Sequence, residues 1–156
     1  MREPLDGYPE IEKQYRGDGS PEAVERCMKP IKDNVKEIIR TVEDVLKHKG
    51  LECVNIFSFQ SRVLGTCKPG SDLDTYVQLH EKHREFVEEN GVWYKGSGMQ
   101  IICGEWAVKY FADTPEEVKD RLKKYHIDIF YGISPIPPAK DEYKGKNYYV
   151  NLKELF

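Results

Sequence analysis

Two carboxylates near the middle of the sequence have the residue type and spacing that divalent-metal chemistry requires. Asp72 and Asp74 are separated by one residue at the start of Leu73–Leu79, a run with strand character. Side chains alternate along a strand, so we expect both carboxylates on one face. Adjacent negative charges repel, and a hard cation bound through oxygen relieves that repulsion. The pair therefore predicts a magnesium site that is open on one side for substrate phosphates.

The residues before this pair are suited to bind phosphate. Lys68–Ser71 (KPGS) has the proline and glycine positions of a type II turn, which would return the chain sharply into the strand. Upstream, the β-branched and aromatic content of Cys53–Phe59 predicts another strand. This strand leads into Gln60–Arg62, where a hydroxyl and backbone N–H groups could hold phosphate oxygens. Gly65 would permit a tight exit from a short helical turn.

In this order, the two turns resemble the signature of the nucleotidyltransferase superfamily related to DNA polymerase beta. That signature has a glycine–serine pair after a strand, a second glycine, and a serine-aspartate-x-aspartate run that enters the next strand. Here S-R-x-x-G lies at Ser61–Gly65, and G-S-D-L-D lies at Gly70–Asp74, with Ser71 directly before the first aspartate. The resemblance spans residues 53–132 of the 156, about half of the chain, and it is more specific than an isolated D-x-D pair.

The resemblance implies a third carboxylate on a later strand, and Asp128 in His126–Phe130 (HIDIF) fits. Asp72 and Asp74 would then hold two magnesium ions, one of them shared with Asp128, which could also accept a proton. The implied reaction transfers a nucleoside monophosphate from a nucleoside triphosphate, expected to be ATP, to a hydroxyl and releases pyrophosphate. The residues expected to bind the nucleotide are Gln60, Ser61, Arg62, Gly65 and Ser71.

One residue departs from the signature, because Gln60 stands where the family has glycine. Glycine permits unusual backbone angles and a close approach of phosphate at this position. Gln60 could disturb that geometry, or its amide could itself bind a phosphate or a base. The first possibility favours an alternative function, a catalytically inactive nucleotide-binding or protein-interaction module of the same fold. The presence of three candidate carboxylates favours an active enzyme.

Simpler structural roles are open for most of these residues. Asp72 and Asp74 could be turn and cap residues, and Asp128 could belong to a buried ion pair. Ser61 could cap a helix, and Arg62 could lie on the surface instead of binding phosphate. Their occurrence together in one ordered arrangement favours the chemical interpretation.

Two other groups of side chains also have a chemical and a structural interpretation. His80 and His83 could bind metal, but solvated helix positions are favoured for both. Four aromatic residues could stack on a nucleobase, although packing onto the core is favoured: Tyr143, Tyr148, Tyr149 and Phe156.

Composition and charge limit the kinds of partner. The formal net charge is −3, which does not favour long nucleic acid because that partner requires many Lys and Arg contacts. The main basic cluster, Arg121, Lys123 and Lys124, is expected to be a solvated helix face. The sequence lacks both the roughly 20 apolar residues of a membrane span and a signal-peptide core. We therefore expect a cytoplasmic protein without a membrane partner. The resemblance to small members of the superfamily implies that the acceptor is a hydroxyl on a protein or small molecule.

The four cysteines, Cys27, Cys53, Cys67 and Cys103, form no C-x-x-C pair. In a cytoplasmic protein they are expected to be reduced and mostly buried, with Cys67 exposed in a loop. Zinc binding and thioredoxin-type redox chemistry are therefore not expected.

Helices must support these strands. Ser20 is expected to cap a helix that Pro30 breaks or restarts. The apolar stripe from Ile31 to Leu46 predicts an amphipathic helix that ends at Gly50. This stripe is long for a small domain, so part of it could face a second copy of the chain or a partner protein. Further helices are expected at His80–Asn90 and from a Thr114 capping box to about Tyr125, with Pro115 as the first helical residue.

Short antiparallel strands are expected within Val92–Phe111, another strand at Ile127–Tyr131, and a final strand with a helical turn within Asn147–Phe156. The elements do not alternate as βαβ units, which indicates an α+β fold: a mixed sheet with helices mainly on one face. The resemblance implies a polymerase-beta-like nucleotidyltransferase core at residues 51–156. A tail and helical segment at residues 1–50 would pack on this core, giving one structural domain.

Overall fold

The computed structural model describes residues 17–67, 73–90, 92–94, 99–101, 115–125, 127–137 and 145–155. Several sequence predictions lie outside these residues, among them the turn at Lys68–Ser71, the first aspartate of the pair, Asp72, and two of the aromatic candidates, Tyr143 and Phe156.

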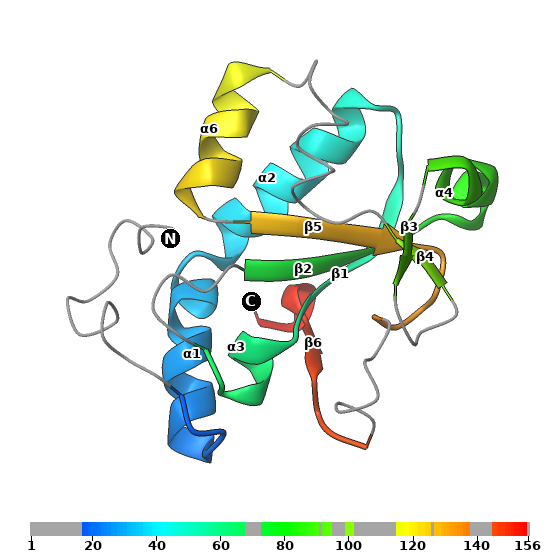
Figure 1. Ribbon diagram of the computed structural model, residues 1–156. Coiled ribbons are helices and arrows are strands. Elements are labelled where there is room, and N and C mark those ends of the chain that lie inside the picture. Colours follow the sequence, from blue (N-terminus) through cyan, green and yellow to red (C-terminus); the bar gives the residue numbers. More distant parts are fainter. Residues whose placement is uncertain are drawn as a thin grey trace.

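Four strands form a mixed sheet in the order β5-β2-β1-β6 (Figure 1). β1 (Cys53–Phe59) is antiparallel to β2 (Leu73–Leu79) and to β6 (Tyr149–Asn151). β5 (Ile127–Gly132) runs parallel to β2 on its other side. Parallel neighbours need a long crossover, so the edge strand β5 returns to β2 from a distant part of the chain. The predicted α+β class and mixed sheet are confirmed.

Two consecutive helices precede the sheet. α1 (Pro21–Asp33) begins at Ser20, whose hydroxyl accepts a hydrogen bond from the Ala23 N–H at 3.2 Å, as predicted. The prediction that Pro30 breaks the helix is wrong. α1 continues through Pro30, and the break falls at Asn34, where φ is −123° and the side-chain amide donates to the Pro30 carbonyl at 2.7 Å. This side-chain bond competes with the helical pattern and separates α1 from α2 (Val35–His48).

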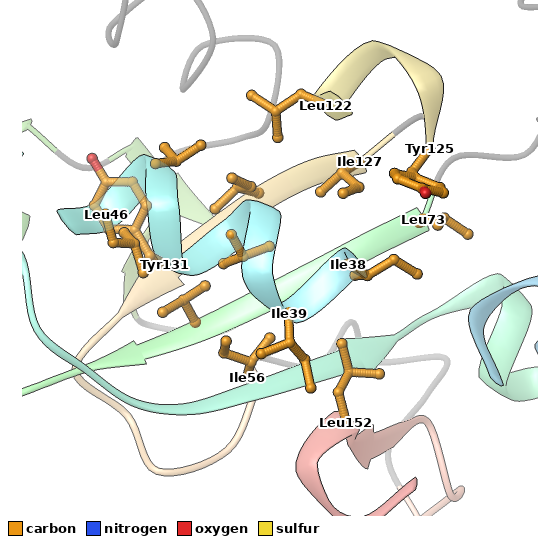
Figure 2. Packing of buried hydrophobic residues seen from close by; sticks show 14 of the residues in the cluster. Ile38, Ile39, Leu46, Ile56, Leu73, Leu122, Tyr125, Ile127, Tyr131 and Leu152 are labelled. Carbon is orange, nitrogen blue, oxygen red and sulfur yellow. The ribbon is translucent and has the colours of Figure 1, made fainter. Parts of the chain in front are cut away.

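The apolar stripe of these helices forms the main core. Side chains of α2 such as Ile38 and Leu46 pack on one face of the sheet, against residues including Ile56 and Tyr131 (Figure 2). α6 (Glu116–Lys124) lies beside α2 and contributes buried side chains to the same cluster. The stripe residues are at most 7% exposed, so the idea that part of the stripe faces another subunit is wrong.

The opposite face of the sheet carries an aromatic layer. Strand side chains alternate between faces, and the residues between the core positions gather in a separate buried cluster. The members of this cluster, called the aromatic layer below, are Phe57, Phe59, Tyr76, Phe130 and Tyr148.

The smaller elements agree with the sequence in kind and differ at their ends. η2 (Glu81–His83) and α4 (Arg84–Asn90) form the predicted helix, and β3 (Val92–Tyr94) pairs antiparallel with β4 (Met99–Ile101). β6 is followed by a short helical turn, η4 (Leu152–Leu155), as predicted.

Pro115 is the N-cap of α6 and not its first helical residue, and Thr114 lies outside the described part of the chain. Within that part, no helix has the length and apolar character needed to cross a membrane.

Candidate functional site

The sheet brings two of the three predicted carboxylates to neighbouring positions. Asp74 on β2 and Asp128 on β5 are paired in the parallel ladder, and adjacent strands are about 4.8 Å apart. Asp128 is placed here by its backbone position. No cluster of three or more His, Cys, Asp or Glu residues suited to a metal occurs within the described residues, which do not include Asp72. The ladder therefore shows a pair, and the third member stays a prediction.

Asp74 belongs to the face of the sheet that α2 and α6 do not cover. Its neighbours Leu73 and Thr75 are buried on the helical side, whereas Tyr76, two residues on, belongs to the aromatic layer. The alternation of strand side chains puts Asp74 on the side of Tyr76. The Asp74 side chain is half-buried, so this carboxylate lies at the margin of the aromatic layer.

Gln60, directly after β1, has a backbone conformation that favours glycine. Its φ is 71° and its ψ is −139°, and among the described residues it is the one non-glycine with a positive φ. Side chains are strained in this region, at a cost of order 1–3 kcal/mol. Backbone hydrogen bonds hold the conformation: the Gln60 N–H donates to the Tyr148 carbonyl at 2.9 Å, and the Gln60 carbonyl accepts from Leu64 N–H at 3.0 Å. Glutamine here has not prevented the glycine-type turn.

The short helix α3 (Ser61–Leu64) follows immediately. Its N-cap is Gln60, so Ser61 is the first helical residue, and the alternative that Ser61 caps the helix is wrong. Gly65 ends the helix with φ 76° and ψ 23°, which confirms the predicted tight exit. A Cβ at Gly65 would lie 2.8 Å from the backbone nitrogen of Val24 in α1, so both the angle and the contact require glycine.

Arg62 has a location that the sequence did not indicate. Its side chain is 2% exposed, and its Nη1 donates to the Cys27 carbonyl of α1 at 3.0 Å. The alternative that Arg62 lies on the surface is therefore wrong. Phosphate binding by Arg62 is untested, and the contact seen here joins α3 to α1.

Two cysteines form a disulfide in the same region, which contradicts the expectation of reduced thiols. Cys27 in α1 is bonded to Cys67, and both are fully buried, so the expectation that Cys67 is exposed is also wrong. The cause is that α1 and the residues before it lie close to the segment after α3, as the hydrogen bond from the Gly17 N–H to the Cys67 carbonyl at 2.8 Å shows. The cysteines are 40 residues apart, and their spacing alone contains no signal for this contact. Burial raises the pKa of the Cys53 thiol, which is free.

The histidines and the basic cluster have structural contacts. The His83 Nε2 accepts a hydrogen bond from the Glu52 N–H at 2.9 Å, and the His80 Nδ1 accepts from the Lys82 N–H at 3.1 Å. Burial is the main cause that lowers the pKa of His83. These bonds support the structural interpretation of both histidines.

The expectation that Arg121 lies on a solvated helix face is wrong. Its Nη2 lies 2.6 Å from the Asp44 carboxylate on α2. Lys123 and Lys124 are exposed, as predicted.

Two tyrosine hydroxyls shape the aromatic side of the sheet. The Tyr76 hydroxyl donates to the Ser134 carbonyl at 2.9 Å, and the Tyr148 hydroxyl donates to the Pro137 carbonyl at 2.6 Å. Burial raises the pKa of both hydroxyls, which keeps them protonated as donors. The segment after β5 is thereby fixed beside the aromatic layer.

No protein-family model, no curated protein and no solved structure matches this chain significantly. The functional interpretation therefore depends on the signature residues and on where the sheet places them.

Proposed function

We propose that this protein is a nucleotidyltransferase that moves a nucleoside monophosphate from a nucleoside triphosphate, expected to be ATP, to a hydroxyl. The observation that carries the proposal is the pairing of Asp74 with Asp128 on adjacent strands. The glycine-type turn at Gln60 supports it, because this turn ends the strand on the other side of β2. Two carboxylates and the turn that we propose binds phosphate thus come from three segments that are separate in the sequence.

The finer fold assignment is part of the same proposal. We assign the chain to the polymerase-beta-like nucleotidyltransferase fold, with helices mainly on one face of the sheet. The support is the antiparallel β1–β2 pair joined by the signature segment, and the parallel addition of β5 with its carboxylate. The aromatic layer would then be the substrate side of the sheet.

The donor set fits magnesium, because carboxylate oxygens are its preferred protein ligands. Asp72, Asp74 and Asp128 would hold two magnesium ions, which would neutralise the charge of the triphosphate and lower the pKa of the acceptor hydroxyl. In the proposed step the hydroxyl oxygen bonds to the α-phosphorus, and the bond from that phosphorus to the oxygen bridging to the β-phosphate breaks. Asp128 accepts the hydroxyl proton, and pyrophosphate leaves.

Phosphate oxygens would be held by the turn after β1. The Ser61 hydroxyl and the backbone N–H groups that follow can donate to them, as can the predicted ligands Gln60, Arg62, Gly65 and Ser71. One observation favours the second candidate, a nucleotide-binding or protein-interaction module without catalysis. A long side chain occupies the strained position where the family has glycine, and this would limit how closely a phosphate approaches.

The acceptor proposed is a hydroxyl on a protein or a small molecule. Long nucleic acid is disfavoured by the net charge of −3. The ion pair between Arg121 and Asp44 supports this view, because it removes one cation from the predicted basic cluster. Association with a second copy or a partner protein is not supported by the apolar stripe, which is buried.

Release of pyrophosphate from ATP in the presence of magnesium and cell extract tests the function. Asp74→Asn removes one metal-binding charge and should lower the rate on the order of 10²-fold. Asp120→Asn, which changes an exposed carboxylate on α6, is the matched control and should leave the rate unchanged. Wild-type release by Asp74→Asn would refute the enzymatic proposal. Magnesium-dependent ATP binding without any turnover would favour the inactive module.

A further inference from the structure

Tyr149 differs from the aromatic residues around it because its ring is partly open to solvent. It is 36% exposed, whereas no member of the aromatic layer is more than 7% exposed. It is the first residue of β6, the strand beside β1 (Figure 1). An exposed tyrosine alone is unremarkable in a folded protein, so its orientation and its neighbours decide what it can do.

Neighbouring rings fix the orientation of Tyr149. Its ring centroid lies 5.6 Å from that of Phe57 with the planes at 84°, and 4.9 Å from that of Tyr148 with the planes at 71°. Both are edge-to-face contacts, the favoured geometry for aromatic pairs. Phe57 is buried, and the Tyr148 hydroxyl is bonded to the Pro137 carbonyl. The Tyr149 ring is therefore held in place before any ligand binds.

The sheet register puts Tyr149 in line with the carboxylates. Asp128 pairs with Asp74, and Phe59 pairs with Tyr149. The pairing of Ser58 with Thr75, continued by one residue, places Phe59 opposite Asp74. One row across the sheet thus runs from the carboxylate pair through Phe59 to Tyr149. Tyr149 lies two strand spacings from Asp74, about 10 Å, and its contact with Phe57 puts it on the aromatic side that Asp74 also borders.

The turn at Gln60, which we propose binds phosphate, lies next to this row, between the carboxylates and Tyr149. Gln60 follows Phe59, and its N–H is bonded to the Tyr148 carbonyl, directly before Tyr149. A triphosphate held between this turn and Asp74 would have its nucleoside within reach of β6. We propose that the exposed face of Tyr149 stacks on the base of the bound nucleotide. This inference rests on the proposed function and adds a base-binding residue to it.

Stacking on one ring recognises the π-face that every nucleobase has, so it adds affinity with little selectivity among bases. Inorganic tripolyphosphate has the phosphates of ATP but no base. A residue that contacts only the base should affect ATP binding and leave tripolyphosphate binding unchanged. A residue with a merely structural role should affect both ligands equally or neither.

The test measures binding of ATP and of tripolyphosphate to the full chain by calorimetry, each with magnesium. Tyr149→Leu should weaken ATP binding about tenfold or more and leave tripolyphosphate binding as in the wild type. Tyr149→Phe keeps the ring and should bind ATP like the wild type. Val54→Ala, at an exposed apolar position near the other end of β1, is the control and should change neither affinity.

The possible outcomes separate this inference from the function on which it rests. If wild-type protein binds both ligands and Tyr149→Leu binds ATP normally, stacking is refuted and the nucleotidyltransferase proposal stands. An equal loss for both ligands in Tyr149→Leu also refutes stacking, because the substitution then acts through the fold. If the wild type binds neither ligand, the proposed function and this inference are both overturned.

Discussion

Gln60 occupies a backbone conformation that favours glycine over every other residue. Gln60→Gly removes strain of about 1–3 kcal/mol and costs about 0.4–1 kcal/mol through the greater freedom of the unfolded chain. We therefore expect the free energy of unfolding to rise by about 1 kcal/mol, measured by urea denaturation. The sequence alone contains no sign of this strain, because the positive φ of Gln60 is visible only in the structure.

Gln60→Ala is the matched control for this substitution. Alanine removes the amide but keeps the Cβ that causes the strain, so it should not stabilise the protein. If Gln60→Ala stabilised it as much as Gln60→Gly, the cost would lie in the glutamine side chain and the strain argument would fail. Magnesium-dependent ATP binding by the same variants shows whether the amide is a ligand.

Single residues of the site were predictable where their chemistry is local. A glycine after a short helix and a carboxylate at the start of a strand have sequence signatures, and Gly65 and Asp74 are found in those settings. Arg62 and the Cys27–Cys67 bond were not predictable, because each depends on how closely α1 approaches α3. That distance is set by tertiary packing, which no spacing in the sequence records.

Helix α1 and the segment after α3 are joined by the Cys27–Cys67 disulfide. A bond that closes a loop with a sequence separation of 40 residues restricts the unfolded chain, and stabilisation of about 2–4 kcal/mol is expected. We predict that a reducing agent lowers the midpoint of thermal unfolding and that Cys27→Ser/Cys67→Ser behaves like the reduced wild type. Disulfides are rare in cytosolic proteins, so this bond argues against the predicted cytoplasmic location.

Cys53→Ser provides the control for the disulfide. Cys53 is a free thiol on β1, so this variant should keep its response to the reducing agent. Mass spectrometry of protein purified without reductant counts the oxidised thiols directly. Two free thiols at Cys27 and Cys67, or a melting curve insensitive to reductant, would contradict the prediction.

Helices and strands could be predicted where the periodicity or composition of the sequence was strong. The pairing of the strands in the sheet could not be predicted. The stripe from Ile31 to Leu46 identified the helical layer, although Asn34 divides it into two helices. The composition of Cys53–Phe59 and Leu73–Leu79 identified β1 and β2 with the bounds observed. The strand order follows from long-range packing, so the placement of β6 beside β1 could not be read from local pattern.

At the scale of the whole molecule, the two ladders flanking β2 differ in sequence separation. β1 and β2 are near neighbours along the chain, whereas β5 pairs with β2 from much further away. Contacts of long separation must overcome a larger loop-closure entropy before they stabilise the fold. We therefore expect the β1–β2 contacts to be present in the folding transition state and the β2–β5 contacts to form after it.

Matched truncations test this order. Ile56 on β1 and Ile129 on β5 are each at most 1% exposed, and replacing either by valine should cost about 0.5–1.5 kcal/mol. Ile56→Val should mainly slow folding, and Ile129→Val should mainly accelerate unfolding, in stopped-flow measurements. The reverse assignment would show that β5 docks early.

This order has a consequence for when the proposed site can form. Asp74 lies in the part of the sheet that forms from nearby segments, and Asp128 arrives with β5, which is expected to pair after the folding transition state. During refolding, the two carboxylates would meet only after the β1–β2 ladder has formed. Magnesium binding at the proposed site would then report the docking of β5, and a chain arrested before that step would have the β1–β2 ladder without the carboxylate pair.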